Sequence, residues 1–343
     1  MLRRLLHHRL FGPGMTLLVL LMANALLNPG FWQLQWRDGH LYGSLIDILN
    51  RAAPLAVVAL GMTLVIAVRG IDISVGAVVA MAAATAALLV GGELVVVDGV
   101  QTHASRTPMA LALVAALAVG ALAGLWNGLL VAGLGMQAIV ATLVLMVAGR
   151  GIAQLLTGGQ IITIYYAPYF YLGSGFLLGL PFALFVAGGL WLLLHLALSR
   201  TALGLFVQAI GVNPAAARLA GVPARAITLC AYVFCGFAAA VAGLMISANV
   251  KSADGNNAGQ LMELDAILAV TLGGTLLNGG RFSLAGSVLG ALSIQTLTAT
   301  IYSMGVPPEI NLVVKASVVF LVMLLQSADF RVWLRQVARR GAA

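Results

Sequence analysis

Charged residues are scarce in this chain and make up 8% of its 343 residues. Soluble domains carry roughly 25% charged residues, so a water-soluble globular protein is excluded. Hydrophobic residues account for 62% of the chain, and the mean hydropathy is +1.05. They occur in blocks near the ~20 residues that an α-helix needs to cross the hydrocarbon core of a bilayer. The composition therefore predicts an all-α fold, a polytopic transmembrane helical bundle.

The residues that carry most enzyme chemistry are also missing. Lys251 and Lys315 are the only lysines, and neither lies in the phosphate-binding motif G-x-x-x-x-G-K-[ST]. No H-E-x-x-H or G-x-S-x-G motif occurs, and no His/Cys cluster has metal-ligand spacing. Cys230 and Cys235 lie five residues apart on different faces of one predicted helix, which argues against a disulfide or a metal site. We expect no enzyme activity, metal or cofactor in this chain itself.

Ten apolar segments are predicted to span the membrane. The basic start and apolar core of the first 27 residues also fit a signal peptide, but the apolar part is long and lacks a clear cleavage site, so an uncleaved first span is preferred. The segments lie near 10–28, 44–68, 74–91, 108–134, 137–157, 175–198, 224–247, 263–279, 284–304 and 309–327. An even number of spans places both termini on one side of the membrane, and together the spans form a single transmembrane domain, 1–343.

The positive charges indicate which side that is. With cytoplasmic termini, twelve arginines face the cytoplasm and three cations, Arg37, Arg106 and Lys251, face outward. Membrane proteins concentrate Lys and Arg in cytoplasmic loops, so this orientation also explains the net charge of +8 without a nucleic-acid partner. The twelve are Arg3, Arg4, Arg9, Arg69, Arg200, Arg218, Arg225, Arg281, Arg331, Arg335, Arg339 and Arg340.

Charged residues inside the predicted spans are functional candidates, because they are costly in lipid. Asp47 and Arg51 are four residues apart on one helix face, and a structural ion pair is favoured over a functional role. Lys315 needs a partner from another helix, and Arg150 either snorkels or meets a carboxylate or backbone carbonyls. An ion-coupled secondary transporter of a small polar solute is the alternative function, but it would need a carboxylate near the midplane, to which Asp47 and Asp72 come nearest.

Amides and hydroxyls in the spans supply a second set of candidates. Helix–helix hydrogen bonding is the favoured role of any one of them, with contact to a polar solute as the alternative. The candidates for a substrate path are Asn127, Gln137, Thr142, Asn249, Gln295 and Asn311. Four acidic residues lie at the outer ends of the last spans, where they either receive a docking protein or are simply solvated: Asp254, Glu263, Asp265 and Glu309.

Glycine spacing indicates how the spans pack. Gly120, Gly124 and Gly128 recur every four residues, as do Gly286 and Gly290. Such faces let helices approach closely in lipid, so we expect them at helix–helix contacts. The stretches 68–76 and 278–286 each combine a charged residue, a serine and a glycine at a predicted cytoplasmic turn, and they form a weak internal repeat.

The polar segment 199–223 interrupts the apolar pattern on the cytoplasmic side. Asn213 caps a helix start, Pro214 suits its first turn, and Gly221 supplies a left-handed stop. The stretch 200–211 is predicted to extend the preceding span. A short rigid helix of this kind suits contact with a cytoplasmic partner, and an ordinary interfacial connector is the alternative. Its candidate coupling residues are Gly211, Asn213, Pro214, Ala216, Arg218 and Gly221.

Much of the chain resembles a known family. RTALGLFVQAIGVNPAAARLAGV (200–222) resembles the coupling-helix region of the ribose-type sugar permeases of bacterial ABC importers. GMTLVIAVRGIDISVGAVVAM (61–81), ELDAILAVTLGGTLLNGGRFSLAGSVLGAL (263–292) and EINLVVKASVVFLVMLLQ (309–326) are similar to further segments of that family in the same order. KSADGNNAG (251–259), GGRFSL (279–284) and GVPPEINLVVKA (305–316) are most similar to its galactofuranose-type members from enteric bacteria.

The resemblance implies an inner-membrane transport subunit without ATPase activity. It implies three kinds of partner: a cytoplasmic ABC ATPase that binds ATP and Mg²⁺, a periplasmic sugar-binding protein, and a second permease chain, with a heterodimer favoured over a homodimer. The segment 211–221 would then insert into the ATPase. Leu205 departs from the family pattern, which often has arginine there, and one possible ionic contact with the ATPase is thereby absent.

Overall fold

The computed structural model describes residues 10–28, 30–37, 39–97, 100–305 and 307–326. This part of the chain is mostly helical, as the sequence predicts. The helices are α2 (Phe11–Leu27), α3 (Ser44–Ala67), α4 (Val75–Val90), α5 (Met109–Gly128) with the π-helical turn η1 (Leu129–Gly133), α6 (Ala138–Thr157), α7 (Ala167–Ser174), α8 (Phe182–Arg200), α9 (Leu203–Val212), α10 (Pro214–Leu219), α11 (Ala224–Val250), α12 (Met262–Leu272), α13 (Leu284–Ser303) and α14 (Pro308–Gln326).

A helix lies over each of the ten segments predicted to span the membrane. Within the described residues, six are long and apolar enough to cross it: α3, α5 with η1, α6, α8, α11 and α13. The apolar helices α2 and α4 and the described apolar part of α14 are shorter. The segment predicted over 263–279 is helical only to Leu272, because Gly274 adopts a left-handed φ of 84° and the chain leaves the helix there.

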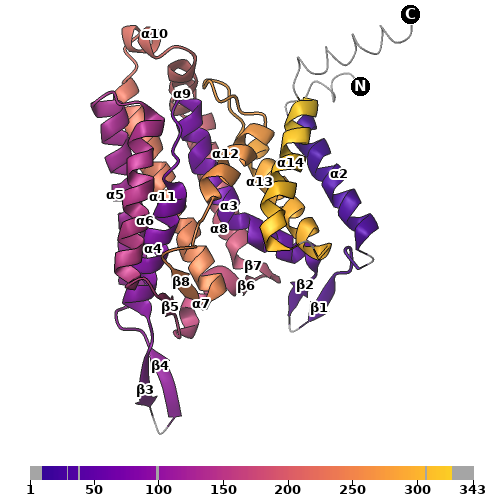
Figure 1. Cartoon of the computed structure of the whole chain (residues 1–343). Coiled ribbons are helices and arrows are strands. Elements are labelled where there is room, and N and C mark those ends of the chain that lie inside the picture. Colours follow the sequence, from indigo (N-terminus) through magenta and orange to yellow (C-terminus); the bar gives the residue numbers. More distant parts are fainter. Residues whose placement is uncertain (1–9, 29, 38, 98–99, 306, 327–343) are drawn as a thin grey trace, which may run out of the picture.

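Short strands at one end of the bundle depart from the all-α expectation. The described residues contain four antiparallel two-stranded ribbons, and all four lie at the end of the molecule opposite α10 (Figure 1). They are β1 (Gln35–Arg37) with β2 (His40–Tyr42), β3 (Glu93–Val97) with β4 (Val100–Ala104), β5 (Ile161–Thr163) with β8 (Ser252–Asp254), and β6 (Phe176–Leu177) with β7 (Leu180–Pro181). The β5–β8 pair ties the end of α6 to the end of α11.

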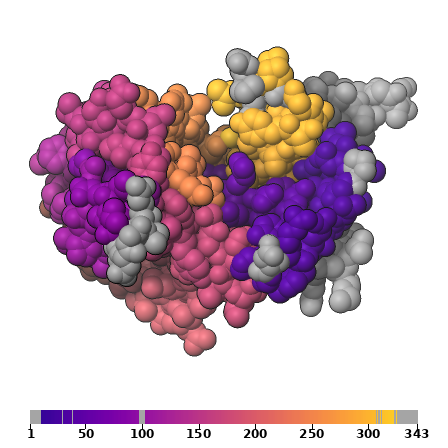
Figure 2. Space-filling model, turned by 90° about the horizontal axis from the view of Figure 1, so that it is seen from below, coloured from indigo at the N-terminus to yellow at the C-terminus, as the bar shows by residue number. Residues whose placement is uncertain are grey.

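The end of the molecule that carries the ribbons is hollowed. Figure 2 shows this face with a depression between the magenta and orange segments on one side and the indigo and yellow segments on the other. We call this end the outer end and the end that carries α10 the coupling end, after the side and the role that the sequence predicts for them.

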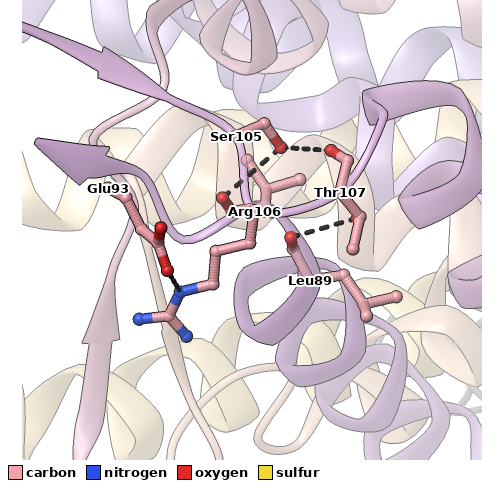
Figure 3. A network of polar contacts seen from close by, with 6 residues as sticks. Leu89, Glu93, Ser105, Arg106 and Thr107 are labelled. Carbon is pink, nitrogen blue, oxygen red and sulfur yellow. Dashed lines mark hydrogen bonds and ion pairs between the residues drawn. The ribbon is translucent and has the colours of Figure 1, made fainter. Parts of the chain in front are cut away.

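The β3–β4 ribbon projects furthest from the helices (Figure 1). Its base is held by a polar network drawn in Figure 3, in which Arg106 Nε lies 3.5 Å from Glu93 Oε1. The Ser105 hydroxyl donates to the Thr107 carbonyl at 2.6 Å, and the Thr107 hydroxyl donates to the Leu89 carbonyl at 3.1 Å. The bond to Leu89 pairs a carbonyl at the C-terminal end of α4 that the helix leaves unpaired, and the network fixes where the ribbon emerges.

The most buried helices are α3, α4 and α11, which form the centre of the bundle. The helices α5, α6 and α8 bury a smaller share of their side chains. Their exposed side chains are largely Leu, Val, Ile and Ala, which suits contact with lipid.

Glycines set the closest helix contacts. On α5, a Cβ at Gly124 would meet the carbonyl of Tyr232 on α11, and on α11 a Cβ at Gly236 would meet the carbonyl of Gly120. On α13, a Cβ at Gly290 would meet the carbonyl of Ala269 on α12. The close packing predicted from the four-residue glycine spacing is thus confirmed for both helix pairs.

Candidate functional site

The coupling end is built from two short helices between α8 and α11. The sequence predicts that the stretch 200–211 continues the preceding span, but α8 ends at Arg200 and a separate helix, α9, begins at Leu203. The Thr201 hydroxyl accepts a hydrogen bond from the Leu203 amide at 3.2 Å, in the turn between the two helices. A Cβ at Gly204 would meet the carbonyl of Leu198, so the sharp turn between the helices requires glycine there.

The short helix α10 has the termini that the sequence predicts. Asn213 is its N-cap, and the Asn213 Oδ1 atom accepts from the amides of Ala215 and Ala216 at 3.0 and 3.1 Å. Pro214 occupies the first turn, and Gly221 follows the helix with a φ of +81°. Ala217 is buried, whereas Arg218 and Leu219 are exposed, and the exposed fraction of Leu219 is 91%. The helix therefore presents a free face at the tip of the coupling end (Figure 1).

Arg69 joins the C-terminal end of α9, which leads into α10, to the rest of the bundle. The Arg69 Nε atom donates to the carbonyls of Gly211 at 2.7 Å and Asn278 at 3.1 Å, and Nη2 donates to the carbonyl of Val212 at 2.7 Å. The amide of Gly280 donates to the carbonyl of Ala67 at 2.9 Å. Carbonyls at the C-terminal end of α9 are left unpaired by the helix, and a guanidinium with its several donors satisfies them.

We call this group of bonds the latch. It joins the two stretches of the weak internal repeat, 68–76 and 278–286, to the segment that leads into α10. A Cβ at Gly211 would meet the Ala67 carbonyl and the Gly280 amide, so only glycine permits this approach. The sequence predicts Gly211 as a coupling residue but not Arg69, which the sequence marks only as a cytoplasmic arginine within the repeat and within the family-like segment 61–81.

If α10 couples to an ATPase, as the resemblance implies, replacing Arg69 with alanine is expected to lower the sugar imported per ATP hydrolysed by about fivefold or more, because α10 would lose part of the contacts that hold it. Arg69→Lys should be intermediate, since one ammonium cannot reproduce the planar fork of donors. Uptake and ATP hydrolysis measured together in proteoliposomes check this. Arg281→Ala is the matched control, because Arg281 is an exposed arginine of the neighbouring loop, and its side chain has no partner among the described residues. Equal coupling ratios for Arg69→Ala and wild type would contradict the role of the latch.

The outer end contains two adjoining cavities. The larger has a volume of about 700 Å³ and lies between α2, α3 and α13, and the smaller, about 240 Å³, lies between α3, α7 and α11. Arg51 and Gln295 line both. A third cavity of about 440 Å³ lies between α3, α8 and α13, and its lining is apolar. Along α3 and α13, the two polar cavities at the outer end are thus followed by the apolar cavity.

The structure divides the residues predicted for a substrate path. Gln295 lines both polar cavities, and Asn249 lines the smaller one while donating to the Gly173 carbonyl at 2.9 Å. Gln137 is exposed at the N-cap of α6, on the coupling side. Asn127 and Thr142 are fully buried in the other half of the bundle. The side chain of Asn311 lies outside the described residues.

Asn127 and Thr142 hold the loop that precedes α4. The Asn127 Nδ2 atom donates to Asp72 Oδ1 at 3.2 Å and to Ser74 Oγ at 2.9 Å, and the Thr142 hydroxyl accepts from the Ile73 amide at 3.3 Å. The Ser74 amide and hydroxyl also donate to Asp72. The buried Asp72 carboxyl is thereby satisfied within the chain and serves as the anchor of this loop.

Asp47 and Arg51 do not form the ion pair predicted from their spacing. Both side chains are exposed and line the larger cavity. Among the described residues, ion pairs join Arg106 to Glu93 and Lys315 to Asp265. A spacing of four residues permits a pair without requiring one, and here both side chains face a cavity in which water can solvate them.

Two of the four acidic residues predicted for docking, Asp254 and Asp265, have partners within the chain. Asp265 pairs with Lys315 at 2.5 Å, the interhelical partner that Lys315 requires, and Glu263 is buried. Asp254 accepts from the amides of Asn256 and Asn257. Although partial burial opposes it, these hydrogen bonds and the charge of Arg150 lower the pKa of Asp254.

Two further sequence predictions concern Glu309 and Arg150. The side chain of Glu309 lies outside the described residues. Arg150 donates to the carbonyl of Ala258 at 2.6 Å, so of the alternatives open for Arg150 the structure shows contact with backbone carbonyls.

Comparison with known proteins places this architecture in a family. Residues 44–323 match the family described as branched-chain amino acid transport system / permease component. The galactofuranose transporter permease protein YtfT of Escherichia coli (strain K12) is 51% identical over 316 residues, which cover 92% of this chain and 89% of the relative. The fructose import permease protein FruF of Bifidobacterium longum (strain NCC 2705) is 36% identical, with 95% and 89% covered. The ribose import permease protein RbsC of Escherichia coli (strain K12) is 35% identical, with 91% and 92% covered.

No solved structure matches the chain. The resemblance to ribose-type permeases is confirmed by relatives that cover nearly the whole chain. Together with the six long apolar helices of the described residues, it identifies a multi-pass protein of the bacterial inner membrane. The chain belongs to the branched-chain amino acid transport system / permease component family.

Proposed function

We propose that this chain is the transmembrane permease subunit of a bacterial ABC-type sugar importer, for a monosaccharide such as galactofuranose. The family description names amino acids, but the relatives quoted above are named as galactofuranose, fructose and ribose permeases. The observation that carries the proposal is the capped helix α10 at the coupling end of a chain related to these permeases. A periplasmic binding protein delivers the sugar, and a separate cytoplasmic ATPase binds and hydrolyses ATP.

The proposed topology has ten spans in one permease domain, with both termini in the cytoplasm. The start of α2 and the end of α14 lie at the coupling end, the same end as α10 (Figure 1), which supports an even number of crossings. The outer cavities then open toward the periplasm. Arg69, Arg200, Arg218, Arg225 and Arg281 lie on the cytoplasmic side of this arrangement, in agreement with the distribution of positive charge in membrane proteins.

The proposed mechanism begins at α10. Closure of the ATPase on ATP pushes this helix, and because α10 lies between α8 and α11, the push tilts both. The latch passes the same displacement to the loop that follows α3 and to the loop that precedes α13, since Arg69 and Gly280 bond across these segments. Both α3 and α13 line the outer cavities, so the push reaches the walls of the path.

The pore is completed by a second permease chain, and a related but different chain is favoured over a second copy. The amides and hydroxyls predicted to line the path are scattered over several helices, so we propose that it passes sugar without a high-affinity site. Micromolar binding of sugar by the purified permease alone would contradict this.

Reconstitution in proteoliposomes tests the proposed function. An ABC importer requires ATP, the ATPase and the binding protein together, and omission of any one is expected to abolish uptake. The alternative, an ion-coupled secondary transporter, would import solute on a proton or sodium gradient alone. Uptake driven by a gradient without ATP would therefore overturn the proposal. A thermal-shift screen of the partner binding protein against pentoses and hexose furanoses would identify the sugar.

A further inference from the structure

Arg51 is a charged residue of α3, one of the helices long and apolar enough to span the membrane. Its side chain, like those of Asp47 and Gln295, has no hydrogen-bond or ion-pair partner among the described residues. A guanidinium carries five donors, and charged groups at membrane depth pair with one another or mark a path for solutes. Arg51 and Gln295 both line the two polar cavities, so their unused hydrogen-bonding capacity is available to a solute in either cavity.

Two other side-chain amides that line the larger cavity already have hydrogen-bond partners. The Asn24 Nδ2 atom donates to the Thr300 hydroxyl at 2.8 Å, and Asn28 Nδ2 donates to the Ser303 hydroxyl at 2.8 Å. These bonds join α2 to α13 and are structural. The contrast separates the lining into residues that hold the helices together and residues that are free to contact a solute.

Asn50 adds an unpaired acceptor beside Arg51. Its Nδ2 atom donates to the carbonyl of Gly173 at 3.3 Å, while its Oδ1 atom is buried and has no partner among the described residues. Asn50 lines the smaller cavity. A buried polar atom without a partner costs stability, so the arrangement favours occupation by a donor such as a hydroxyl or a water molecule.

The charge and shape of the space indicate the class of solute. Asp47 and Arg51 are the charged residues that line the larger cavity, and their formal charges cancel. An anionic solute would instead require an excess of positive charge. Tyr302, whose side chain is exposed, supplies apolar surface against which the C–H face of a sugar ring can pack. The volume of about 700 Å³ is in the range of small-molecule sites.

We propose that Asp47, Arg51 and Gln295 form an outer subsite that binds a neutral polyhydroxylated solute on its way through the permease. Arg51 donates to solute hydroxyls or the ring oxygen, Asp47 accepts from hydroxyls, and Gln295 does both. The inference rests on the proposed function. The subsite binds the solute weakly, because a solute in transit must also be released. It lies in the polar cavities that precede the apolar cavity along α3 and α13.

The test uses the complete transporter in proteoliposomes with radiolabelled D-galactose, D-fructose and D-ribose. Arg51→Ala is expected to lower uptake by about tenfold or more, the loss that corresponds to one hydrogen bond from a charged group. ATP hydrolysis stimulated by the binding protein should stay within about twofold of wild type, because the coupling end is untouched. Arg37→Ala is the matched control, since Arg37 is an exposed arginine of β1 at the same end.

A charge reversal separates the subsite from a purely structural pair. The double variant Asp47→Arg with Arg51→Asp keeps both charges, so it would restore uptake if the residues only neutralised each other. We expect no restoration, because donors and acceptors would be exchanged relative to the solute. Full uptake by Arg51→Ala, or full restoration by the reversal, would overturn the subsite. Failure of the wild-type transporter to import any of the three sugars with ATP would instead count against the proposed function.

A labelling experiment keeps the proposal testable if Arg51→Ala folds poorly. Gln295→Cys is introduced together with Cys230→Ser, which removes the exposed native thiol. A membrane-impermeant thiol reagent should modify this cysteine from the outer side, and an excess of the imported sugar should slow the reaction. The protection should be lost with Arg51→Gln. A reaction rate unaffected by sugar when Arg51 is present would overturn the proposal.

Discussion

Replacement of residues Asn213–Arg218 by a Gly/Ser linker of equal length is expected to lower sugar uptake by at least about a hundredfold, near the upper end of typical coupling energies. The linker removes the Asn213 cap and the buried Ala217, so the segment can no longer hold a helix. A flexible segment absorbs a push instead of transmitting it. Membrane insertion should persist, because the apolar helices are unchanged. Uptake, ATP hydrolysis and the amount of membrane-inserted protein are the three measurements.

A variant that keeps the helix is the control for this experiment. Asn213→Ser retains an N-cap acceptor and is expected to import sugar at close to the wild-type rate. If the linker variant imported sugar normally, α10 would not be the coupling element. If it failed to insert, the comparison with Asn213→Ser would show that the defect lies in assembly, and Arg69→Ala would remain the test of coupling.

Gly124→Leu is expected to destabilise the protein by more than about 3 kcal/mol, enough to prevent a folded permease from accumulating. On α5, a Cβ at this position would meet the Tyr232 carbonyl and lie 2.8 Å from the Val233 Cα atom, both part of the α11 backbone. A backbone cannot move aside as a flexible side chain can, so α5 and α11 would have to separate. Thermal unfolding, monitored by size-exclusion chromatography in detergent, measures the effect.

Gly189→Leu is the matched control for this substitution. Gly189 lies in α8, and a Cβ there meets no atom within 4 Å. The same change in side-chain volume at a site that faces open space should leave the melting temperature close to that of wild type. Equal stability of the Gly124 and Gly189 variants would show that the α5–α11 contact is not set by glycine.

Features that depend on neighbouring residues were predictable from the sequence. The Asn213 cap, Pro214 in the first turn and the left-handed Gly221 are all local, and α10 forms as they predict. Glycine spacing predicted faces of close approach because the period is a property of one helix. The ten apolar segments follow from composition, and helices occupy each of them.

Features that depend on distant segments were not predictable in the same way. The latch joins Arg69 to the carbonyls of Gly211 and Asn278, a contact between three parts of the chain. The spacing of Asp47 and Arg51 favoured a local pair, but the cavity walls that keep both side chains solvated come from α2 and α13. The four ribbons were missed because strands of two to five residues give little periodic signal.

The latch also sets an order of events during biosynthesis. Arg69 reaches the carbonyls of Gly211 and Val212 early, but the bonds from Arg69 to Asn278 and from Gly280 to Ala67 require a later part of the chain. At about 5–20 residues per second, Gly280 is made roughly 3 to 14 s after Val212. During this interval α10 is present in the nascent permease, but the latch bonds that involve Asn278 and Gly280 have not yet formed. If an ATPase docks on α10 as proposed, one that does so during synthesis would meet a helix that cannot yet drive the path, and assembly and activity would be separate steps.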